Sequence, residues 1–184
     1  MTDRLRALLF DATSPEAAEG ASWGWIGLVA SSRGLRLLTL PVPSHDEALA
    51  EVRKHYPEVP LTPADPFLSD VAGQVREYLA GERRTFAVEL DLRGHNPFAL
   101  AVWAAASRIP YGQTRTYTWI AEQIGGVGAA QAVGVALSIN PIPLIIPCHR
   151  VIGADGGLHG YAGGLLLKAR LLALESGQAQ LPLG

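Results

Sequence analysis

The stretch TYTWIAEQIGGVGAAQAVGVAL, residues 116–137, decides the architecture of the second half of this chain. Its first part, Thr116 to Gln123, predicts a short helix, and its second part, Ala129 to Leu137, predicts another. The segment GGVG at 125–128 predicts a tight turn, because glycine reaches backbone conformations that other residues avoid. Val133 and Leu137 have the spacing of an inward stripe. Two helices joined by a short glycine turn have helix–turn–helix spacing.

The second of these helices is unusual because most of its residues are small. Gln131 is its large polar side chain, and helical periodicity places it on the outward side. The small residues are Ala129, Ala130, Ala132, Gly134 and Ala136. Such a smooth helix can approach another surface closely, and that surface is either the groove of DNA or a neighbouring helix of the same domain. Helix pairs of this kind are also common in ordinary packing, so the spacing alone leaves both interpretations open.

The only cysteine follows this unit. Leu144–Ile146 is a short apolar run that predicts a strand, and Pro147 ends it because proline has no N–H for a ladder. Cys148 is therefore expected where a buried strand emerges. A single cysteine excludes intramolecular disulfides and cysteine-rich zinc sites, and it suggests a reducing compartment. A lone cysteine is often only a small buried apolar residue, so the neighbouring residues determine whether a reactive role is expected.

His149 and Arg150 directly follow the cysteine, and a nearby imidazole or guanidinium can lower the pKa of a thiol towards neutrality. On an extended strand adjacent side chains point to opposite faces, so His149 reaches Cys148 only through a bend or a bridging water. A glycine-rich loop at 153–164 then leads into a predicted helix, Leu165 to Glu175. Glu175 ends that helix, where the dipole disfavours a carboxylate. Glu175 is either a solvated surface residue or a residue held by a hydrogen-bonding partner, and His149 is the candidate partner.

The first half of the chain has a different pattern. Residues 23–40 predict a β-hairpin with its turn at 31–34, and residues 46–56 and 67–79 predict helices. Residues 85–92 alternate apolar and polar side chains, which predicts a further strand. From Asn96 the pattern becomes helical up to Arg108. We therefore expect an α/β domain over 1–92 and a mostly α-helical domain with the helix–turn–helix over 93–184.

Composition limits the classes of partner. The chain has 184 residues, 48% of them hydrophobic, with a formal net charge of −2 and a pI near 6.2. Those values favour compact domains over disorder, and they provide no global positive field for a polyanion or an acidic membrane. Any DNA binding must come from a local surface. Apolar runs stay short of a membrane span, so a soluble, cytoplasmic protein is expected.

Pro147–Val151 (PCHRV), preceded by Asn140–Pro141 and followed by GYAGGL at 160–165 and Lys168, resembles the O6-alkylguanine-DNA alkyltransferases. Residues 109–117 and Ala132–Gly134 resemble further blocks of that family. The resemblance implies a ribonuclease-H-like fold for residues 1–92. It also implies direct, single-turnover DNA repair, in which an alkylated guanine is flipped out of the duplex and its alkyl group moves to a cysteine. O4-alkylthymine is a second candidate substrate.

The resemblance also implies roles for individual residues. Cys148 would be the nucleophile, His149 the water-linked base, and Glu175 the group that orients His149. Tyr117 would donate a proton to the guanine, and Asn140 would be a hinge between the recognition helix and the cysteine. The extruded base would lie against Val151, Tyr161, Ala162 and Gly163. DNA would contact Thr116, Ala129, Ala130, Gln131, Gly134, Val135 and Arg150, with the helix in the minor groove.

The family resemblance implies a monomer without a cofactor, and no zinc is expected because the first domain has no cysteine. Gln131 stands where the family usually has an arginine that fills the space of the flipped base. Two other functions stay open. A lesion-binding protein of the alkyltransferase-like kind would lack the cysteine, whereas Cys148 is present. A thiol hydrolase would need one of the other histidines beside Cys148, namely His45, His55, His95 or His159.

Overall fold

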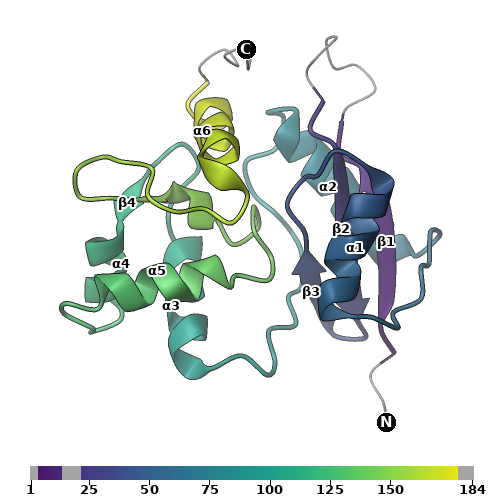
Figure 1. Ribbon diagram of the computed structural model, residues 1–184, viewed down its shortest axis with the longest axis horizontal. Coiled ribbons are helices and arrows are strands. Elements are labelled where there is room, and N and C mark those ends of the chain that lie inside the picture. The colour runs from purple at the N-terminus through teal and green to yellow at the C-terminus, as the bar shows by residue number, and fades with distance from the viewer. Residues whose placement is uncertain (1–3, 14–21, 178–184) are drawn as a thin grey trace. The chain divides into compact units, whose positions relative to one another are not determined.

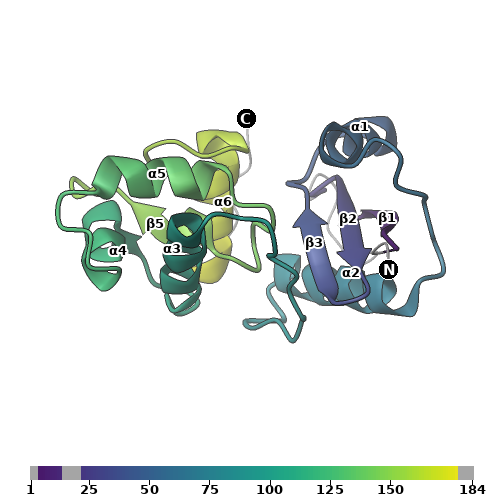
Figure 2. The same ribbon diagram turned by 90° about the horizontal axis from the view of Figure 1, so that it is seen from below.

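The computed structural model describes residues 4–13 and 22–177, and the chain divides into two compact units, Met1–Leu92 and Arg93–Gly184. The first unit contains a three-stranded antiparallel sheet of β1 (Arg6–Asp11), β2 (Trp25–Ser31) and β3 (Gly34–Leu38), with β2 in the centre. Two helices, α1 (His45–His55) and α2 (Pro66–Leu79), lie on opposite faces of this sheet (Figure 2). The fold of this unit is the expected α/β arrangement.

The central strand explains why the sheet is covered on both sides. From Ile26 onward every residue of β2 is buried, so neither face of the strand is left to solvent. Gly27 allows α1 to approach closely, because a Cβ there would lie 2.3 Å from the Val52 side chain. Both helices begin at side-chain caps: Ser44 accepts from the Glu47 N–H, and Asp65 accepts from the Leu68 N–H.

Two expectations for this unit need correction. β1 was not predicted, and it exists because its residues pair along their whole length with β2, from Arg6 opposite Ala30 to Asp11 opposite Trp25. The strand predicted at 85–92 is wrong: in that segment only Leu90 forms a bridge, with Leu35. The segment is extended but held differently, because the side-chain amide of Gln74 both donates to and accepts from the Ala87 backbone.

The second unit is mostly helical, as expected. Its elements are α3 (Pro97–Ser107), α4 (Tyr117–Gln123), α5 (Ala130–Ser138) and α6 (Gly164–Glu175), with a short parallel pair of strands, β4 (Arg115–Thr116) and β5 (Val151–Ile152) (Figure 1). Helices α3, α4 and α5 contact one another. The indole N–H of Trp103 on α3 donates to the Ala136 carbonyl on α5 at 2.9 Å, and both residues are buried. This unit contains every residue of the predicted site.

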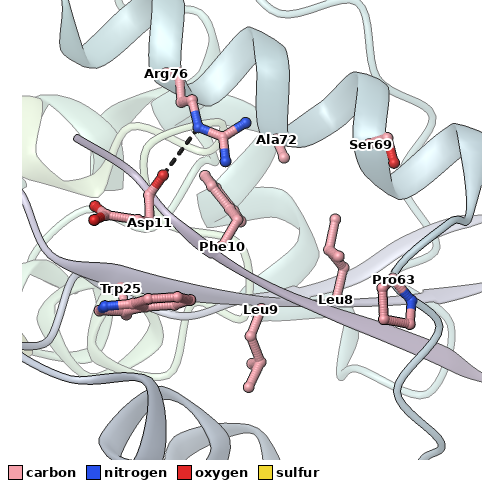
Figure 3. A pocket seen from close by; sticks show the side chains of 9 residues that line it. All are labelled: Leu8, Leu9, Phe10, Asp11, Trp25, Pro63, Ser69, Ala72 and Arg76. Carbon is pink, nitrogen blue, oxygen red and sulfur yellow. Dashed lines mark hydrogen bonds between the residues drawn. The ribbon is translucent and has the colours of Figure 1, made fainter. Parts of the chain in front are cut away.

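The first unit has a hollow of about 440 Å³ that was not foreseen (Figure 3). Arg76 spans one side of it: its Nε donates to the Asp11 carbonyl at 2.9 Å and its guanidinium lies 4.9 Å from the centre of the Phe10 ring. The hollow is lined by Leu8, Leu9, Phe10, Asp11, Trp25, Pro63, Ser69, Ala72 and Arg76.

Candidate active site around Cys148

Cys148 opens a single 3-10 turn, Cys148–Arg150, directly after Pro147. The strand predicted at 144–146 is wrong. Leu144 has φ +71°, a left-handed conformation that breaks an extended run, and Ile146 bridges back only to Pro143. Prolines at 141, 143 and 147 remove three N–H donors, so the segment cannot build a ladder. The cysteine therefore begins a compact 3-10 turn and does not follow a strand.

Asn140 fixes the position of the thiol. Its Nδ2 donates to the Cys148 Sγ at 3.2 Å and to the Ile146 carbonyl at 2.9 Å, while its Oδ1 accepts from the Ile142 N–H at 3.0 Å. Asn140 lies just after α5, so one amide group joins the end of that helix to the turn that carries the thiol. Cys148 is 8% exposed, which makes the sulfur buried yet not sealed from solvent.

Burial raises the pKa of Cys148 above its ordinary value, although several groups oppose that effect, among them a backbone hydrogen bond to the sulfur. The Asn140 amide, the positive charge of Lys168 and the Tyr161 hydroxyl each lower the pKa of the thiol. Contrary to the prediction from the sequence, the neighbouring groups do not bring this pKa towards neutrality in the free protein. Desolvation outweighs the neighbours, and the resting sulfur is a protonated thiol.

His149 turns away from the adjacent thiol towards α6. Its Nε2 lies 2.9 Å from the Glu175 Oε1, and both side chains are fully buried. Burial lowers the pKa of His149 below its ordinary value, and this exceeds the opposing effect of Glu175. The imidazole is therefore neutral. Because a carboxylate only accepts hydrogen bonds, Nε2 carries the proton and Nδ1 carries the lone pair that a base needs.

Arg150, predicted to contact DNA, is instead buried at 7% exposure. Its Nε and Nη2 donate to the Glu175 carboxylate at 2.8 to 3.1 Å, and its Nη1 donates to the Ile109 carbonyl at 2.6 Å. Burying a guanidinium requires such a partner, since an unpaired charge inside a protein is very costly. The physical task of Arg150 in this structure is to hold Glu175.

Glu175 accepts a further hydrogen bond from the Gly112 N–H at 3.1 Å. With His149 and Arg150, the carboxylate therefore meets donors from three residues, which explains how it tolerates the C-terminal end of α6. Gly112 has φ +74°, and a Cβ there would lie 3.0 Å from the Glu175 carbonyl, so this close approach favours glycine. The loop before the helix–turn–helix thus closes onto the same carboxylate.

Lys168 is a site residue whose role sequence reasoning missed. Its Nζ is fully buried and donates to the carbonyls of Val151 at 2.6 Å and His159 at 3.1 Å. The signal was present in the sequence, because Lys168, Leu171 and Glu175 have the three- and four-residue spacing of one helix face. All three side chains are buried, so this face of α6 points into the site.

Tyr117 begins α4 and reaches the same loop, since its hydroxyl donates to the His159 carbonyl at 2.9 Å. Burial, and then the nearby thiol, raise the pKa of Tyr117, so the hydroxyl keeps its proton at neutral pH. Burial, the nearby thiol and a hydrogen bond with that thiol raise the pKa of Tyr161 well above its ordinary value. Two phenol groups that keep their protons at neutral pH therefore lie near the sulfur.

The remaining residues predicted for the base pocket follow the cysteine. Val151 is buried in β5, and its carbonyl already accepts from Lys168. Ala162 and Gly163 are exposed, and they lie just before the start of α6. The residues predicted to surround the base thus come from β5 and from the loop that leads to α6.

The helix–turn–helix residues occupy the expected elements. Thr116 caps α4 by accepting from the Trp119 N–H at 3.0 Å. On α5, Gln131 and Val135 are exposed, while Val133 and Leu137 are buried, which matches the inward stripe. Ala129 and Ala130 are partly buried at the start of that helix. A Cβ on Gly134 would lie 3.8 Å from the Tyr117 ring, so α5 passes directly over a predicted catalytic side chain.

Comparisons with known proteins agree with the resemblance seen in the sequence. A family model described as the DNA-binding domain of 6-O-methylguanine DNA methyltransferase matches residues 97–177, and one described as its ribonuclease-like domain matches residues 22–92. A methylated-DNA–protein-cysteine methyltransferase of Mycobacterium tuberculosis is 53% identical over 118 residues, which cover 64% of this chain and 71% of the relative. The inducible enzyme of Bacillus subtilis is 43% identical over 130 residues, covering 71% and 72%.

Solved structures give the same result for the fold. The crystal structure of Mycobacterium tuberculosis OGT in complex with DNA superposes with a TM-score of 0.78 at 39% identity, covering 97% of each chain. A structure of O6-methylguanine methyltransferase from the same organism has a TM-score of 0.74 at 39% identity, covering 95% of this chain and 94% of that one. Within the described ranges, none of the helices is long and apolar enough to cross a membrane.

Proposed function

This chain belongs to the O6-methylguanine-DNA methyltransferase family, and from that membership we propose that it repairs DNA by transferring an alkyl group from guanine O6 to Cys148. The observation that carries the proposal is the set of groups around the sulfur. The thiol accepts from Asn140, has the charge of Lys168 nearby, and directly precedes a histidine held by Glu175. These groups can position a sulfur and stabilise its anion at the moment of attack.

The transfer balances without a cofactor. A bond forms between the Cys148 sulfur and the alkyl carbon while the bond between that carbon and guanine O6 breaks. The thiol proton passes to His149, which we propose acts through a bridging water, and Tyr117 supplies a proton to the departing guanine. His149 then releases its extra proton to solvent and Tyr117 takes one up, so both side chains return to their neutral forms. The products are an S-alkylcysteine and an ordinary guanine. A thioether has no route back to the thiol here, so each protein molecule acts once.

The resting protonation states suit this sequence of events. A buried neutral thiol resists non-specific oxidation and alkylation, because the thiolate is the reactive form. His149 is neutral, so it can accept the proton as soon as a substrate lies in line with the sulfur. The nucleophile is therefore formed only when its target is present.

The target base must leave the duplex to reach a buried sulfur. Extruding a nucleotide costs a few kcal/mol, and less when its pair is already weakened. We propose that α5 offsets this cost from the minor groove, where the small residues Ala130 and Gly134 permit a close approach. The base would then lie against Val151, Tyr161, Ala162 and Gly163, within the unit formed by residues 93–184.

Other features of the proposal come from the sequence and the family. We propose that the protein is a monomer in a reducing, cytoplasmic compartment. We also propose that it acts on O6-alkylguanine, with O4-alkylthymine as a second substrate. A protein that binds lesions without transfer is the alternative, and Cys148 with its donors favours transfer. The test is stoichiometry: purified protein should remove O6-methylguanine from a duplex up to one lesion per molecule. Multiple turnover, or no removal at all, would contradict the proposal.

A further inference from the structure

Two exposed side chains, Asp155 and His159, are joined within the loop that leads from β5 to α6 (Figure 1). The His159 Nε2 lies 2.8 Å from the Asp155 Oδ1, and the two side chains are 59% and 67% exposed. The same carboxylate oxygen accepts from the Gly157 N–H at 3.0 Å. Hydrogen bonds from Gly157 and then from His159 lower the pKa of Asp155, so the carboxylate is ionised at neutral pH. We call Asp155 and His159 the loop clasp.

The loop clasp packs against the backbone of Gly153, the residue that directly follows β5. A Cβ on Gly153 would lie 2.2 Å from the His159 Cδ2 and 2.3 Å from the Asp155 Oδ1, so only glycine leaves room for the pair. Gly153 is buried, and its N–H donates to the Gly157 carbonyl at 2.9 Å. β5 is itself paired with β4. The clasp therefore ties the later part of the loop to a strand that is already held in place.

The backbone carbonyl of His159 contacts two groups of the proposed chemistry. It accepts from the Tyr117 hydroxyl at 2.9 Å and from the Lys168 Nζ at 3.1 Å. Tyr117 is the proposed proton donor to the guanine, and the charge of Lys168 lowers the pKa of the Cys148 thiol. The position of one carbonyl therefore sets where both groups lie.

The chain on either side of His159 is rich in glycine. Gly160 follows in a left-handed conformation, φ +30°, and a Cβ there would meet nothing within 4 Å. Gly156 and Gly157 precede it, in the same loop as the carboxylate. Glycine has more conformational freedom than any other residue, so ordering such a segment is costly. Side-chain contacts such as the clasp are therefore needed to hold the His159 carbonyl in one direction.

We propose that the loop clasp is a positioning device for alkyl transfer, which holds the His159 carbonyl where Tyr117 and Lys168 need it. The inference rests on the proposed function, since it concerns the groups that serve that transfer. The clasp acts through the carbonyl and does not touch the reacting atoms. Because an exposed ion pair contributes little to global stability, its loss should slow transfer while the free energy of unfolding stays nearly the same.

Single-turnover transfer from a duplex containing O6-methylguanine, followed over a range of duplex concentrations, separates binding from chemistry. His159→Ala should lower the saturating rate about ten-fold, because a well-placed proton donor contributes on the order of 100-fold or more and is here partly displaced. The duplex concentration that gives half the maximal rate, and the final yield of one methyl per protein, should stay unchanged. An unchanged saturating rate overturns the proposal.

Two further variants test whether the clasp acts as a unit. His159→Gln should recover most of the rate, because its amide nitrogen can still donate to the Asp155 carboxylate. Asp155→Ala should be as slow as His159→Ala, and the double variant should be no slower than either, since each substitution alone opens the clasp. Additive losses in the double variant, or a Gln variant as slow as Ala, overturn the proposal.

Gly153→Ala tests the same contact without removing either partner. Its Cβ would displace the clasp, so transfer should slow as it does in His159→Ala. Gly73→Ala is the matched control, because a Cβ on Gly73 in α2 would meet nothing within 4 Å. His45→Ala is the control for the histidine, since His45 is also exposed and its Nδ1 lies 3.2 Å from the Asp46 Oδ1. Both controls should transfer at the wild-type rate, and equal slowing in them overturns the proposal.

Two other roles for the pair give different results in the same experiments. If His159→Ala raises only the duplex concentration for half the maximal rate, the side chain contacts DNA and the proposal fails. If urea unfolding shows a large loss of stability, with fewer active molecules reacting at the wild-type rate, the pair is only structural and the proposal also fails. A wild-type protein that methylates Cys148 while the clasp variants react equally fast overturns only this inference. No methyl on wild-type Cys148 overturns the proposed function.

Discussion

The Asn140 side chain donates to the sulfur of Cys148 at 3.2 Å and, from the same nitrogen, to the carbonyl of Ile146 at 2.9 Å. One amide therefore sets both the shape of the turn and the electrostatics of the thiol. Asn140 directly follows Ile139, the C-cap of α5. Movement of α5 would therefore shift the side chain that holds the sulfur.

Replacing this amide should affect the chemistry and the fold differently. Asn140→Ala removes a donor that lowers the pKa of Cys148, so that pKa rises, transfer slows, and lost hydrogen bonds cost about 1–3 kcal/mol of stability. Asn140→Asp keeps the size and the acceptor for Ile142, but places a negative charge beside the thiol. Single-turnover rates should therefore be lower for Asp than for Ala, although urea unfolding should show Asp to be the more stable. A faster Asp variant contradicts this role.

The raised pKa of Cys148 predicts how the free protein reacts with a small alkylating reagent. Because the folded pKa lies above the ordinary value, the thiolate fraction at neutral pH is smaller than in the unfolded chain. Iodoacetamide should therefore modify the native protein more slowly than the urea-unfolded protein at pH 7, and the native rate should keep rising above pH 9. A native rate that exceeds the unfolded one at neutral pH would show that the neighbours outweigh burial.

The same shift predicts a loss of stability in alkali. A buried thiol whose folded pKa is raised contributes stability below the unfolded pKa, and that contribution disappears as the pH rises through the folded pKa. In Cys148→Ala the alkaline loss should be smaller when the free energy of unfolding is followed from pH 7 upward. This variant is the control for the reactivity experiment, since it should take up no reagent.

Glu175→Gln should separate structure from chemistry when it is combined with a second substitution. Alone, it leaves the Arg150 guanidinium buried without its counter-charge and should cost about 3–5 kcal/mol of stability. Adding Arg150→Met removes that charge and should restore part of the stability, yet transfer should stay slow because His149 still lacks its carboxylate. Urea unfolding and single-turnover rates would be measured on the wild type and on both variants. Recovery of the rate together with the stability would mean that Glu175 is only structural.

Gln131→Arg should speed the repair of a methylated duplex. An arginine adds charge and reach at the position expected to fill the space of the flipped base, so the variant should bind more tightly and transfer several-fold faster. Ala132→Arg is the matched control, because it adds the same charge at the neighbouring exposed position. If both variants gain equally, charge alone explains the effect, and if Gln131→Arg is no faster than wild type, the argument about this position is wrong.

Local patterns were enough to predict much of the fold. The helices at 45–55, 66–79 and 97–107 follow from apolar periodicity and from caps such as Asn96, whose side chain accepts from the Ala99 N–H. The hairpin followed from its turn. β1 was missed because its four-residue apolar run, Ala7–Phe10, becomes a strand only through its partner, and the pairing of Arg6 with Ala30 spans many intervening residues. The alternation of apolar and polar residues at 85–92 led to a wrong strand prediction for the same reason. No neighbouring strand pairs with this segment along its length, and only Leu90 forms a bridge, with Leu35.

The site shows a similar division between local and long-range information. Cys148, His149 and Glu175 could be proposed from type and spacing, because each has a chemistry that its neighbours explain. Arg150 could not be placed from the sequence, because a cation next to a reactive cysteine suits DNA as well as it suits a buried carboxylate. The fold decides between them by bringing Glu175 and the Ile109 carbonyl to its guanidinium. The pKa of the thiol likewise depends on burial, which sequence spacing does not report.

The most direct measurement is the intact mass of the wild-type protein after it is mixed with a duplex that contains O6-methylguanine. The account predicts a gain of one methyl group, located on Cys148 by peptide mapping, with one guanine restored per protein molecule. Cys148→Ala should bind the same duplex and gain no mass. An unchanged wild-type mass together with lesion-selective binding, or a methyl group on any other residue, would contradict the claim that this sulfur is the acceptor.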